Sequence, residues 1–271
     1  MAKFKRILLT GAAGGLGKVL RQGLAPLCET LRLNDRIDMG KAAANEEIVL
    51  ADLDDMDAVM EMTKEVDAVA HFGGRSVEDK YKEILHSNIM GGYNIYEACR
   101  LNGVPRIVFA SSNHAIGYYP RTQRIDDSVP HRPDTMYGVS KAFVEDLASL
   151  YYDKHGIETV SLRIGSSFPE PRDHRMLATW MSYDDLIQLV SCSLTAHHVG
   201  NHVVYGVSDN KEQFWDNASA RLIGYVPKDS SESFREKIES TVERPDRTDP
   251  SVIYCGGMYV NYPHWDDKEE I

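Results

Sequence analysis

A tyrosine and a lysine separated by four positions, Tyr137 and Lys141, are the side chains of this sequence best suited to taking a proton from an alcohol. On a helix, this spacing puts the two side chains one turn apart on the same face. A phenol has a pKa near ~10, so it is a poor base at neutral pH unless a positive charge stabilises the phenolate. The pair is therefore a candidate general base with its activator. Because many surface helices carry such a pair, the interpretation depends on the other motifs of the chain.

A glycine-rich turn, TGAAGGLG, follows the first apolar run and precedes an amphipathic segment. A dinucleotide-binding turn occupies this position in a first βαβ unit. We expect Gly11 to permit the tight turn, Gly14 to let the backbone approach a diphosphate, and Gly17 to allow close contact between helix and strand. The diphosphate would then lie at the positive end of the helix, beside Gly15 and Leu16.

An acidic residue, Asp35, ends the second apolar run, 18 residues after Gly17. A carboxylate in this place accepts hydrogen bonds from the ribose hydroxyls of NAD and repels the 2′-phosphate of NADP. Arg36 complicates the preference, because a guanidinium can pair with that phosphate. The sequence therefore predicts NAD as the preferred cofactor, although an exposed aspartate in a turn would have the same appearance.

Two further strand ends carry residues that could contact the cofactor. Asp52 and Leu53 end the third apolar run, where an aspartate side chain could reach the adenine amino group. Phe72, Gly73 and Gly74 follow the fourth apolar run. Their glycines leave room for the cofactor, because they carry no side chain. We therefore expect four successive strand ends to form one dinucleotide site.

Short apolar segments alternate with longer amphipathic segments along the first 205 residues. The expected strands are 6–10, 31–35, 48–51, 68–71, 106–110, 159–163 and 202–205. The expected helices are 15–27, 54–64, 81–101, 137–154 and 183–196, with shorter ones at 213–223 and 231–241. This pattern predicts an α/β fold with a Rossmann-type doubly wound parallel sheet. We expect residues 1–205 to form the NAD-binding Rossmann domain, and the polar residues 206–271 to form a small C-terminal substrate-binding cap rather than an independent domain.

Composition and charge restrict the class of partner. The formal net charge of −11 disfavours nucleic acid and anionic membrane surfaces, because like charges repel. The four cysteines lie far apart without a C-x-x-C pair, which is typical of reduced thiols. The N-terminal segment runs directly into a strand, and no apolar run approaches the ~20 residues that span a membrane. We therefore expect a cytoplasmic protein whose partner is a small molecule.

Three more motifs accompany the glycine turn and the Tyr-x-x-x-Lys pair: NIMGGYN from Asn88, VFASS ending at Ser112, and LRIG around Ile164. In this order they resemble the extended short-chain dehydrogenases/reductases. The resemblance implies NAD as the cofactor, Tyr137 as the base, Lys141 as its activator, and Ser112 as a hydrogen-bond partner of the reacting oxygen. It also implies that Asn88 supports the active-site helix and that Asn88 and Ile164 contact the cofactor. A purely structural role fits Asn88 almost as well.

A narrower resemblance extends over essentially the full chain, from SSNHAIGYYP and YGVSK through RIGS and PEP to WDN and a Gly-Gly pair near the C-terminus. These segments are similar to bacterial uronate dehydrogenases, which oxidise D-glucuronate or D-galacturonate with NAD to the aldarolactone. The resemblance selects Arg175, from the candidates Arg75, Arg172 and Arg175, as the guanidinium that meets the sugar carboxylate. Arg75 departs from the small or apolar residue of that family. The residues placed at the sugar are Ser76, Ser112, Asn113, His114, Tyr137, Ser166, Arg175 and Tyr259. The resemblance also implies a homo-oligomer.

Other interpretations share parts of this pattern. A nucleotide-sugar epimerase or dehydratase has every motif up to residue 165 but needs a larger C-terminal domain. A non-catalytic NAD-sensing protein typically lacks the tyrosine or the lysine, and this chain has both. His197, His198 and His202 are a possible metal cluster, but the reaction needs no metal and no carboxylate is obviously paired with them, so we expect none. We expect His71 to be a packed strand-end residue. His114 could equally be a structural residue of this kind instead of a sugar contact.

Overall fold

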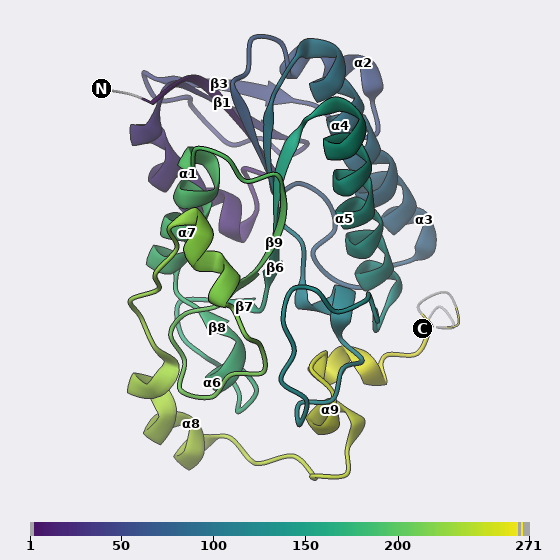
Figure 1. Ribbon diagram of the computed structural model, residues 1–271, viewed down its shortest axis with the longest axis vertical. Coiled ribbons are helices and arrows are strands. Elements are labelled where there is room, and N and C mark those ends of the chain that lie inside the picture. The colour runs from purple at the N-terminus through teal and green to yellow at the C-terminus, as the bar shows by residue number, and fades with distance from the viewer. Residues whose placement is uncertain (1–2, 265–266, 268–271) are drawn as a thin grey trace.

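The computed structural model describes residues 3–264 and 267. Seven parallel strands form one sheet in the order β3-β2-β1-β4-β5-β6-β9 (Figure 1). They are β1 (Phe4–Thr10), β2 (Cys28–Asp35), β3 (Glu46–Leu50), β4 (Ala68–His71), β5 (Arg106–Phe109), β6 (Glu158–Ile164) and β9 (Asn201–Gly206). The predicted α/β fold with a Rossmann-type parallel sheet is confirmed, and no end of a predicted strand in this sheet is displaced by more than three residues.

Helices cover both faces of the sheet, because its strands are apolar on both faces. The helices α1 (Gly15–Leu24) and α7 (Tyr183–Thr195) cover one face, and α2 (Met56–Met62), α4 (Gly91–Asn102) and α5 (Met136–His155) cover the other (Figure 1). Along β1, Ile7 and Leu9 join the core beneath α1 and α7, whereas Leu8 joins the core on the opposite face. This alternation is the pattern of a strand buried on both sides.

The strand order reverses at β1, whose neighbours are β2 and β4. In open α/β sheets, ligands bind at the carboxyl ends of the strands beside such a reversal. Gly11 follows β1, Asp35 ends β2, and Phe72 follows β4. The topology therefore brings the predicted dinucleotide motifs to one edge of the sheet.

The predicted helices 81–101 and 213–223 differ most from the observed structure, whereas 15–27 and 231–241 each consist of an α-helix and a 3₁₀ turn. The segment 81–101 consists of α3 (Tyr81–Ile84), a π-helical turn η2 (Leu85–Met90) and α4, and such π turns are frequent at functional sites. The prediction for 213–223 is wrong except for the 3₁₀ helix η4 (Ala218–Ile223). The preceding residues run past Ile125, with which Trp215 forms a β-bridge, and the Trp215 ring stacks on Tyr205 at 4.9 Å between centroids. Tertiary burial of that tryptophan overrides the local helical pattern.

The remaining elements are short. They are η1 (Ala25–Leu27), η3 (Asn113–Ile116), β7 (Ser166–Ser167), α6 (Met176–Thr179), β8 (Trp180–Met181), η5 (Ser231–Phe234), α8 (Arg235–Thr241), α9 (Pro250–Ile253) and η6 (Gly257–Asn261). In the C-terminal part, Ile223 and Tyr225 join the core beneath α1 and α7, and Cys255 packs with Ile116 and Tyr119. Over residues 3–264 and 267, no helix combines the length and apolar character needed to cross a membrane.

Candidate active site

The glycine turn after β1 closes tightly against neighbouring backbone. Gly11 has a φ of +70°, and a Cβ there would lie 2.5 Å from the carbonyl oxygen of Phe72. A Cβ at Gly17 would lie 2.0 Å from the carbonyl oxygen of Gly11. Only glycine fits at these two positions. Gly14 and Gly15 line a cavity at the N-terminus of α1, where backbone N–H groups and the helix dipole could hold a diphosphate.

The carboxylate of Asp35 is fixed beside this turn. Its Oδ2 accepts a hydrogen bond from the backbone N–H of Ala13 at 3.0 Å, and its Oδ1 accepts one from Ile37 at 3.2 Å. The half-exposed guanidinium of Arg36 is turned toward Asp52, with 4.0 Å between Nη1 and Oδ2. Two carboxylates and one guanidinium thus line this end of the cavity. They can accept hydrogen bonds from ribose hydroxyls, and their net negative charge disfavours an additional phosphate.

The first turn of α5 presents Tyr137 to the cavity. Thr135 caps this helix by accepting from the N–H of Gly138 at 3.1 Å, and Glu78 Oε2 accepts from the N–H of Tyr137 at 2.7 Å. Burial raises the pKa of the Tyr137 phenol, whereas a hydrogen bond with Ser112 acts in the opposite direction. A positive charge near the phenol is therefore needed before it can act as a base at neutral pH.

Lys141 supplies that charge one turn further along α5. Its Nζ lies 5.5 Å from the ring centroid of Tyr137 and 4.9 Å from that of Phe109, and it donates a hydrogen bond to the carbonyl of Ala110 at 2.8 Å. Burial lowers the pKa of Lys141 to about 8. The predicted placement of the pair on one helix is confirmed, because α5 contains both Tyr137 and Lys141. Both residues also line the same cavity.

The side chains of Ser111 and Ser112 have different partners, which the sequence alone does not decide. Ser112 lines the cavity together with Tyr137, and its Oγ accepts from the backbone N–H of His114 at 3.2 Å. Ser111 is buried and donates from Oγ to Glu145 Oε1 at 2.5 Å. The choice of Ser112 over Ser111, which came from the family resemblance alone, therefore agrees with the direction in which each hydroxyl points.

Glu145 is a buried residue of the site that sequence reasoning missed. It accepts hydrogen bonds from Arg163 Nη2 and from His131 Nε2, each at 2.8 Å. Burial opposes ionisation of Glu145, but His131 and Arg163 together hold the pKa of its carboxyl below the usual value. The ionised carboxylate in turn raises the pKa of Lys141, against the larger effect of burial. The sequence signal that could have identified Glu145 was its position four residues after Lys141, which places both side chains on the same face of the helix.

Asn88 and Asn113 lie behind the wall of the cavity. Asn88 donates to Ser140 Oγ at 2.9 Å and to the carbonyl of Arg75 at 3.1 Å, so both of its N–H groups are used by the protein. Asn113 is fully buried, and its Oδ1 accepts from Arg175 Nη2 at 2.8 Å. Neither belongs to the described residues that line the cavity. The structure thus places them where they hold α5 and Arg175, rather than against the cofactor or the sugar as the sequence predicts.

Arg175 enters the cavity from the segment before α6. Its Nε donates to the carbonyl of Cys255 at 2.8 Å, its Nη1 to Ser166 Oγ at 3.3 Å, and its Nη2 to Asn113. A guanidinium has five N–H donors, so two remain for a ligand. Burial lowers the pKa of Arg175, and no carboxylate among the described residues forms an ion pair with it. A guanidinium in this state is suited to binding a ligand carboxylate.

His114 lines the cavity between Asp134 and Tyr259. Its Nδ1 lies 2.8 Å from Asp134 Oδ2, and its ring stacks on Tyr259 with 3.9 Å between centroids. Asp134 fills the space beside two glycines, because a Cβ at Gly117 or Gly256 would lie 1.8 or 1.9 Å from its Oδ2. The sequence did not reveal Asp134 as the partner of His114, since 20 residues separate them.

One continuous cavity of about 1330 Å³ joins these groups. The predicted cofactor residues that line it are Gly11, Gly14, Gly15, Leu16, Gly17, Asp35, Arg36, Asp52, Leu53, Phe72, Gly73, Gly74, Tyr137, Lys141 and Ile164. The predicted sugar residues that line it are Ser76, Ser112, His114, Tyr137, Ser166, Arg175 and Tyr259. Arg75 also lines the cavity, but its guanidinium is paired with Asp79 at 3.1 Å and with Glu83 at 3.0 Å. Its charge is therefore largely neutralised.

Two histidines of the predicted cluster, His198 and His202, have partners within the protein. His198 pairs with Glu158, so the expectation that no carboxylate accompanies this cluster is wrong, and His202 lies 3.2 Å from the carbonyl oxygen of Ser219. His71 is a packed strand-end residue as expected, and burial lowers its pKa to about 3. Within the part of the chain that the structure describes, no three or more His, Cys, Asp or Glu side chains gather in a way that could hold a metal ion.

The fold, the dinucleotide turn and the Tyr-x-x-x-Lys pair define an NAD-dependent oxidoreductase. Residues 7–202 match the NAD dependent epimerase/dehydratase family. The uronate dehydrogenase of Pseudomonas syringae pv. tomato is 53% identical over 266 residues, which cover 98% of this chain and 96% of that protein.

Two solved structures share the fold over nearly their full length. The crystal structure of glucuronic acid dehydrogenase from Chromohalobacter salexigens is 54% identical, with a TM-score of 0.96 over 97% of this chain and 99% of that one. A mutant of uronate dehydrogenase from Agrobacterium tumefaciens in complex with NAD is 50% identical, with a TM-score of 0.93 over 96% and 98% of the two chains. The chain belongs to the NAD dependent epimerase/dehydratase family and, within it, to the uronate dehydrogenases.

Proposed function

We propose that this protein oxidises a hexuronate, D-glucuronate or D-galacturonate, at C1 to the aldarolactone, with NAD as the oxidant. The observation that carries the proposal is that Ser112, Tyr137 and Lys141 line the same cavity as the guanidinium of Arg175, which has no ionic partner among the described residues. The first group suits oxidation of an alcohol, and the second suits recognition of a carboxylate at the far end of the sugar. The similarity to uronate dehydrogenases supports the same reaction.

In the proposed reaction, Ser112 and Tyr137 hydrogen-bond the C1 hydroxyl of the cyclic uronate. Bound NAD supplies an acceptor for the hydride that leaves C1. Tyr137 takes the hydroxyl proton, and Lys141 favours the phenolate that this step requires. Loss of the proton and the hydride turns C1 into the carbonyl carbon of a lactone. Asn88 acts as a positioning residue, because its amide holds α5 through Ser140.

The proposed cofactor site follows the strand ends. The diphosphate lies at the N-terminus of α1, and Asp35 accepts from the ribose hydroxyls, which favours NAD over NADP. The residues assigned to it are Gly11, Gly14, Gly15, Leu16, Gly17, Asp35, Arg36, Asp52, Leu53, Phe72, Gly73, Gly74, Tyr137, Lys141 and Ile164. The remaining polar residues of the cavity, Ser76, His114 and Ser166, are assigned to the sugar hydroxyls, with Tyr259 closing over the ring.

The alternative of a dehydratase is disfavoured by Asp134. A dehydratase usually carries an acidic pair just before the tyrosine, whereas the segment 133–136 supplies a single aspartate in a different place. Its Oδ2 is bonded to His114, and its Oδ1 accepts from Thr135 Oγ1 at 3.1 Å. The carboxylate is therefore occupied by the protein.

A panel of sugars with NAD, followed by the appearance of NADH, tests the proposal. Either uronate should react, and the neutral hexoses of the same configuration should react poorly. The Arg175→Ala variant should raise KM for the uronate by about 10²-fold, because truncating one partner of a buried charge pair costs about 2–5 kcal/mol. Its Kd for NADH, measured by fluorescence, should not change. Arg221→Ala, an exposed arginine outside the cavity, is the matched control.

A reaction with neither uronate would refute the substrate assignment. An equal loss for neutral sugars in Arg175→Ala would make Arg175 structural. These two results separate the identity of the substrate from the role of this residue.

We also propose the organisation of the whole protein. Residues 1–205 act as the NAD-binding domain and 206–271 as a cap. The proposal is supported by the core that Ile223 and Tyr225 share with the sheet.

Exposed apolar residues of α4 and α5, among them Tyr93, Val139 and Phe143, support a homo-oligomer. Free cysteines support a cytoplasmic location. Light scattering of the wild type and of Phe143→Glu tests the oligomer, which the charged variant should dissociate.

A further inference from the structure

The cavity continues outward beyond Arg175. We define its outer part by Arg121, Arg172, Glu212, Val242, Arg244 and Arg247, all of which line the same cavity as Tyr137. In Figure 1, the segment that contains 242–247 runs along the lower edge of the molecule from α8 to α9. A single monosaccharide held by Tyr137 at one end and Arg175 at the other leaves this outer part without a ligand. The oxidation of a free uronate therefore gives no role to the outer part of the cavity.

Three guanidiniums of the outer part have no ionic partner among the described residues. Arg172 lies over the ring of Phe168, with 3.9 Å between Cζ and the centroid, and Arg247 is exposed. Arg121 donates to the carbonyls of Tyr254 at 3.1 Å and Ser251 at 2.6 Å, which leaves three of its five N–H groups. Burial and the neighbouring charge of Arg175 lower the pKa of Arg121 to about 10.

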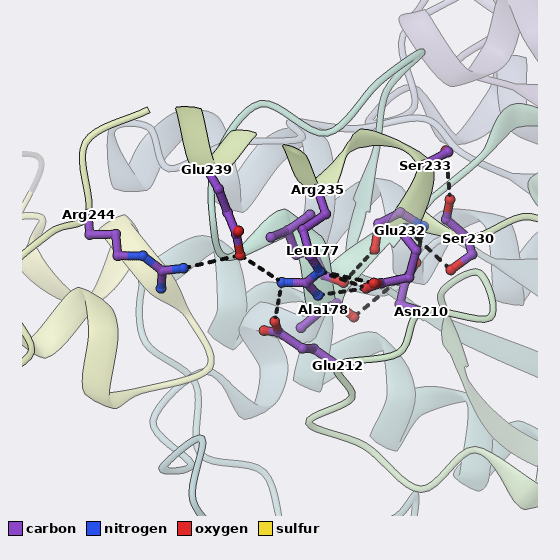
Figure 2. Close-up of polar contacts among 11 residues, drawn as sticks. Leu177, Ala178, Asn210, Glu212, Ser230, Glu232, Ser233, Arg235, Glu239 and Arg244 are labelled. Atoms are coloured by element: carbon purple, nitrogen blue, oxygen red, sulfur yellow. Dashed lines mark hydrogen bonds and ion pairs between the residues drawn. The ribbon is translucent and has the colours of Figure 1, made fainter. Parts of the chain in front are cut away.

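Other charges in the outer part are already neutralised. Figure 2 shows Arg244 bonded to Glu239, which also binds Arg235, while Arg235 binds Glu212 and Glu232. Within this network, the pair of Arg244 and Glu239 connects the 242–249 segment to α8. Two further acidic residues line the cavity here: Asp173 accepts from the N–H of Met176 at 2.8 Å, and Glu243 is exposed. Among the residues that line the outer part, four arginines thus accompany three acidic residues, Asp173, Glu212 and Glu243, in a protein whose net charge is −11.

The chemistry of the ring determines what can reach these cations. In a hexuronate pyranose, the carboxylate is attached to C5, and O4 is carried by the adjacent ring atom, across the ring from C1. With C1 at Tyr137 and the carboxylate at Arg175, a group attached to O4 therefore leaves the sugar site on the side of Arg175. Arg121 is close enough to Arg175 for the two charges to interact, and Arg172 lines the same cavity. A uronate linked through O4 would carry its own carboxylate toward them.

We propose that the outer part of the cavity binds a second, O4-linked uronate residue, so that the enzyme also oxidises the reducing end of short 4-linked acidic oligosaccharides. This inference rests on the proposed function. The chemistry is unchanged: C1 of the reducing-end residue loses a hydride to NAD, its hydroxyl loses a proton to Tyr137, and the product is the lactone of the disaccharide. The glycosidic bond is neither formed nor broken. Arg172 and Arg247, at the open end, meet the second carboxylate.

The test compares a purified 4-linked digalacturonate with galacturonate, using the full-length protein and NAD. The expected result is NADH formation together with a disaccharide product two hydrogens lighter by mass spectrometry. That product distinguishes true oxidation of the dimer from oxidation of contaminating monomer. The double variant Arg172→Ala/Arg247→Ala should raise KM for the dimer about three- to tenfold, since each exposed ion pair contributes only modestly to binding. Its KM for the monomer should not change, and Arg221→Ala should alter neither.

Normal oxidation of galacturonate with no disaccharide lactone would overturn this inference and leave the proposed function intact. Oxidation of neither sugar would instead refute the proposed function. If the double variant oxidises the dimer with an unchanged KM, Arg172 and Arg247 do not form the second subsite. The monomer rate serves as an internal check that the variant is folded.

Discussion

Asp134 Oδ2 lies 2.8 Å from His114 Nδ1, and both groups are buried at the sugar end of the cavity. Because a carboxylate can only accept, it keeps the proton of a neutral imidazole on Nδ1. The other ring nitrogen, Nε2, is then an acceptor, which under the proposed function can accept a hydrogen bond from a sugar hydroxyl. Gly117 and Gly256 leave no room for any side chain that would displace this carboxylate. Asp134 is thus a positioning residue that acts through His114.

Replacing Asp134 by asparagine tests this relationship. The amide can donate to Nδ1 and move the imidazole proton to Nε2, which turns an acceptor into a donor. We expect kcat/KM for the uronate to fall about tenfold, which corresponds to one lost hydrogen bond of about 1.4 kcal/mol. The Kd for NADH should not change. A purely structural aspartate would instead lower the melting temperature without affecting KM, and Asp209→Asn on the exposed surface is the control.

The Tyr137→Phe variant removes the proposed base and keeps the ring. Loss of a positioned general base lowers rates by about 10²–10⁴-fold. We therefore expect uronate oxidation to be nearly abolished while NADH still binds, as measured by fluorescence titration. A variant with a rate near that of the wild type would contradict the mechanism. Tyr152→Phe, on the same helix but outside the cavity, provides the comparison.

The lowered pKa of Lys141 leads us to expect that the free energy of unfolding depends on pH. Burial lowers this pKa from 10.5 to about 8, so between these values the unfolded chain binds more protons at this group than the native protein does. The free energy of unfolding contributed by Lys141 therefore rises with pH across that window, by up to about 3 kcal/mol. The free energies of unfolding of the wild type and of Lys141→Met can be measured with a denaturant at several alkaline pH values. The free energy of the wild type relative to that of the variant should rise with pH. A difference independent of pH would contradict the assigned shift.

The buried pair of Glu145 and Arg163 predicts a large loss of stability in Glu145→Gln. The amide cannot balance the Arg163 guanidinium, whose Nη2 lies 2.8 Å from Glu145 Oε2. Breaking a buried pair from one side costs about 3–5 kcal/mol. The surface pair of Glu61 and Lys64 is the matched comparison, because Glu61→Gln should cost less than about 1 kcal/mol. Equal effects in urea unfolding would show that burial does not matter here.

The Asp35→Ala variant removes the carboxylate placed for the ribose hydroxyls. We expect weaker binding of NAD and a narrower preference over NADP, because the repulsion of a 2′-phosphate is lost. Steady-state kinetics with both cofactors measure the ratio of the two kcat/KM values. Asp38→Ala, in the exposed loop that follows, should leave this ratio unchanged. A wild-type protein that reacts faster with NADP would refute the assignment.

The sequence by itself determined the features that depend on local pattern. Apolar runs of strand length, a glycine turn after the first of them, and the four-residue spacing of Tyr137 and Lys141 are set by backbone geometry and periodicity. These rules need no knowledge of distant residues. They were sufficient to predict the parallel sheet, the edge of the sheet that carries the dinucleotide motifs, and the helix face that carries Tyr137 and Lys141.

Tertiary structure decided which polar groups face the cavity and which support it. The directions of Ser111 and Ser112 depend on Glu145, which lies 34 residues after Ser111, and His114 depends on Asp134. The amide of Asn113 is turned to Arg175 instead of to a ligand. A buried polar group must find a hydrogen-bond partner, and that partner is chosen by folding rather than by spacing along the chain. The sequence therefore predicted Tyr137 and Lys141 as the reacting pair, whereas the fold determined which groups surround them.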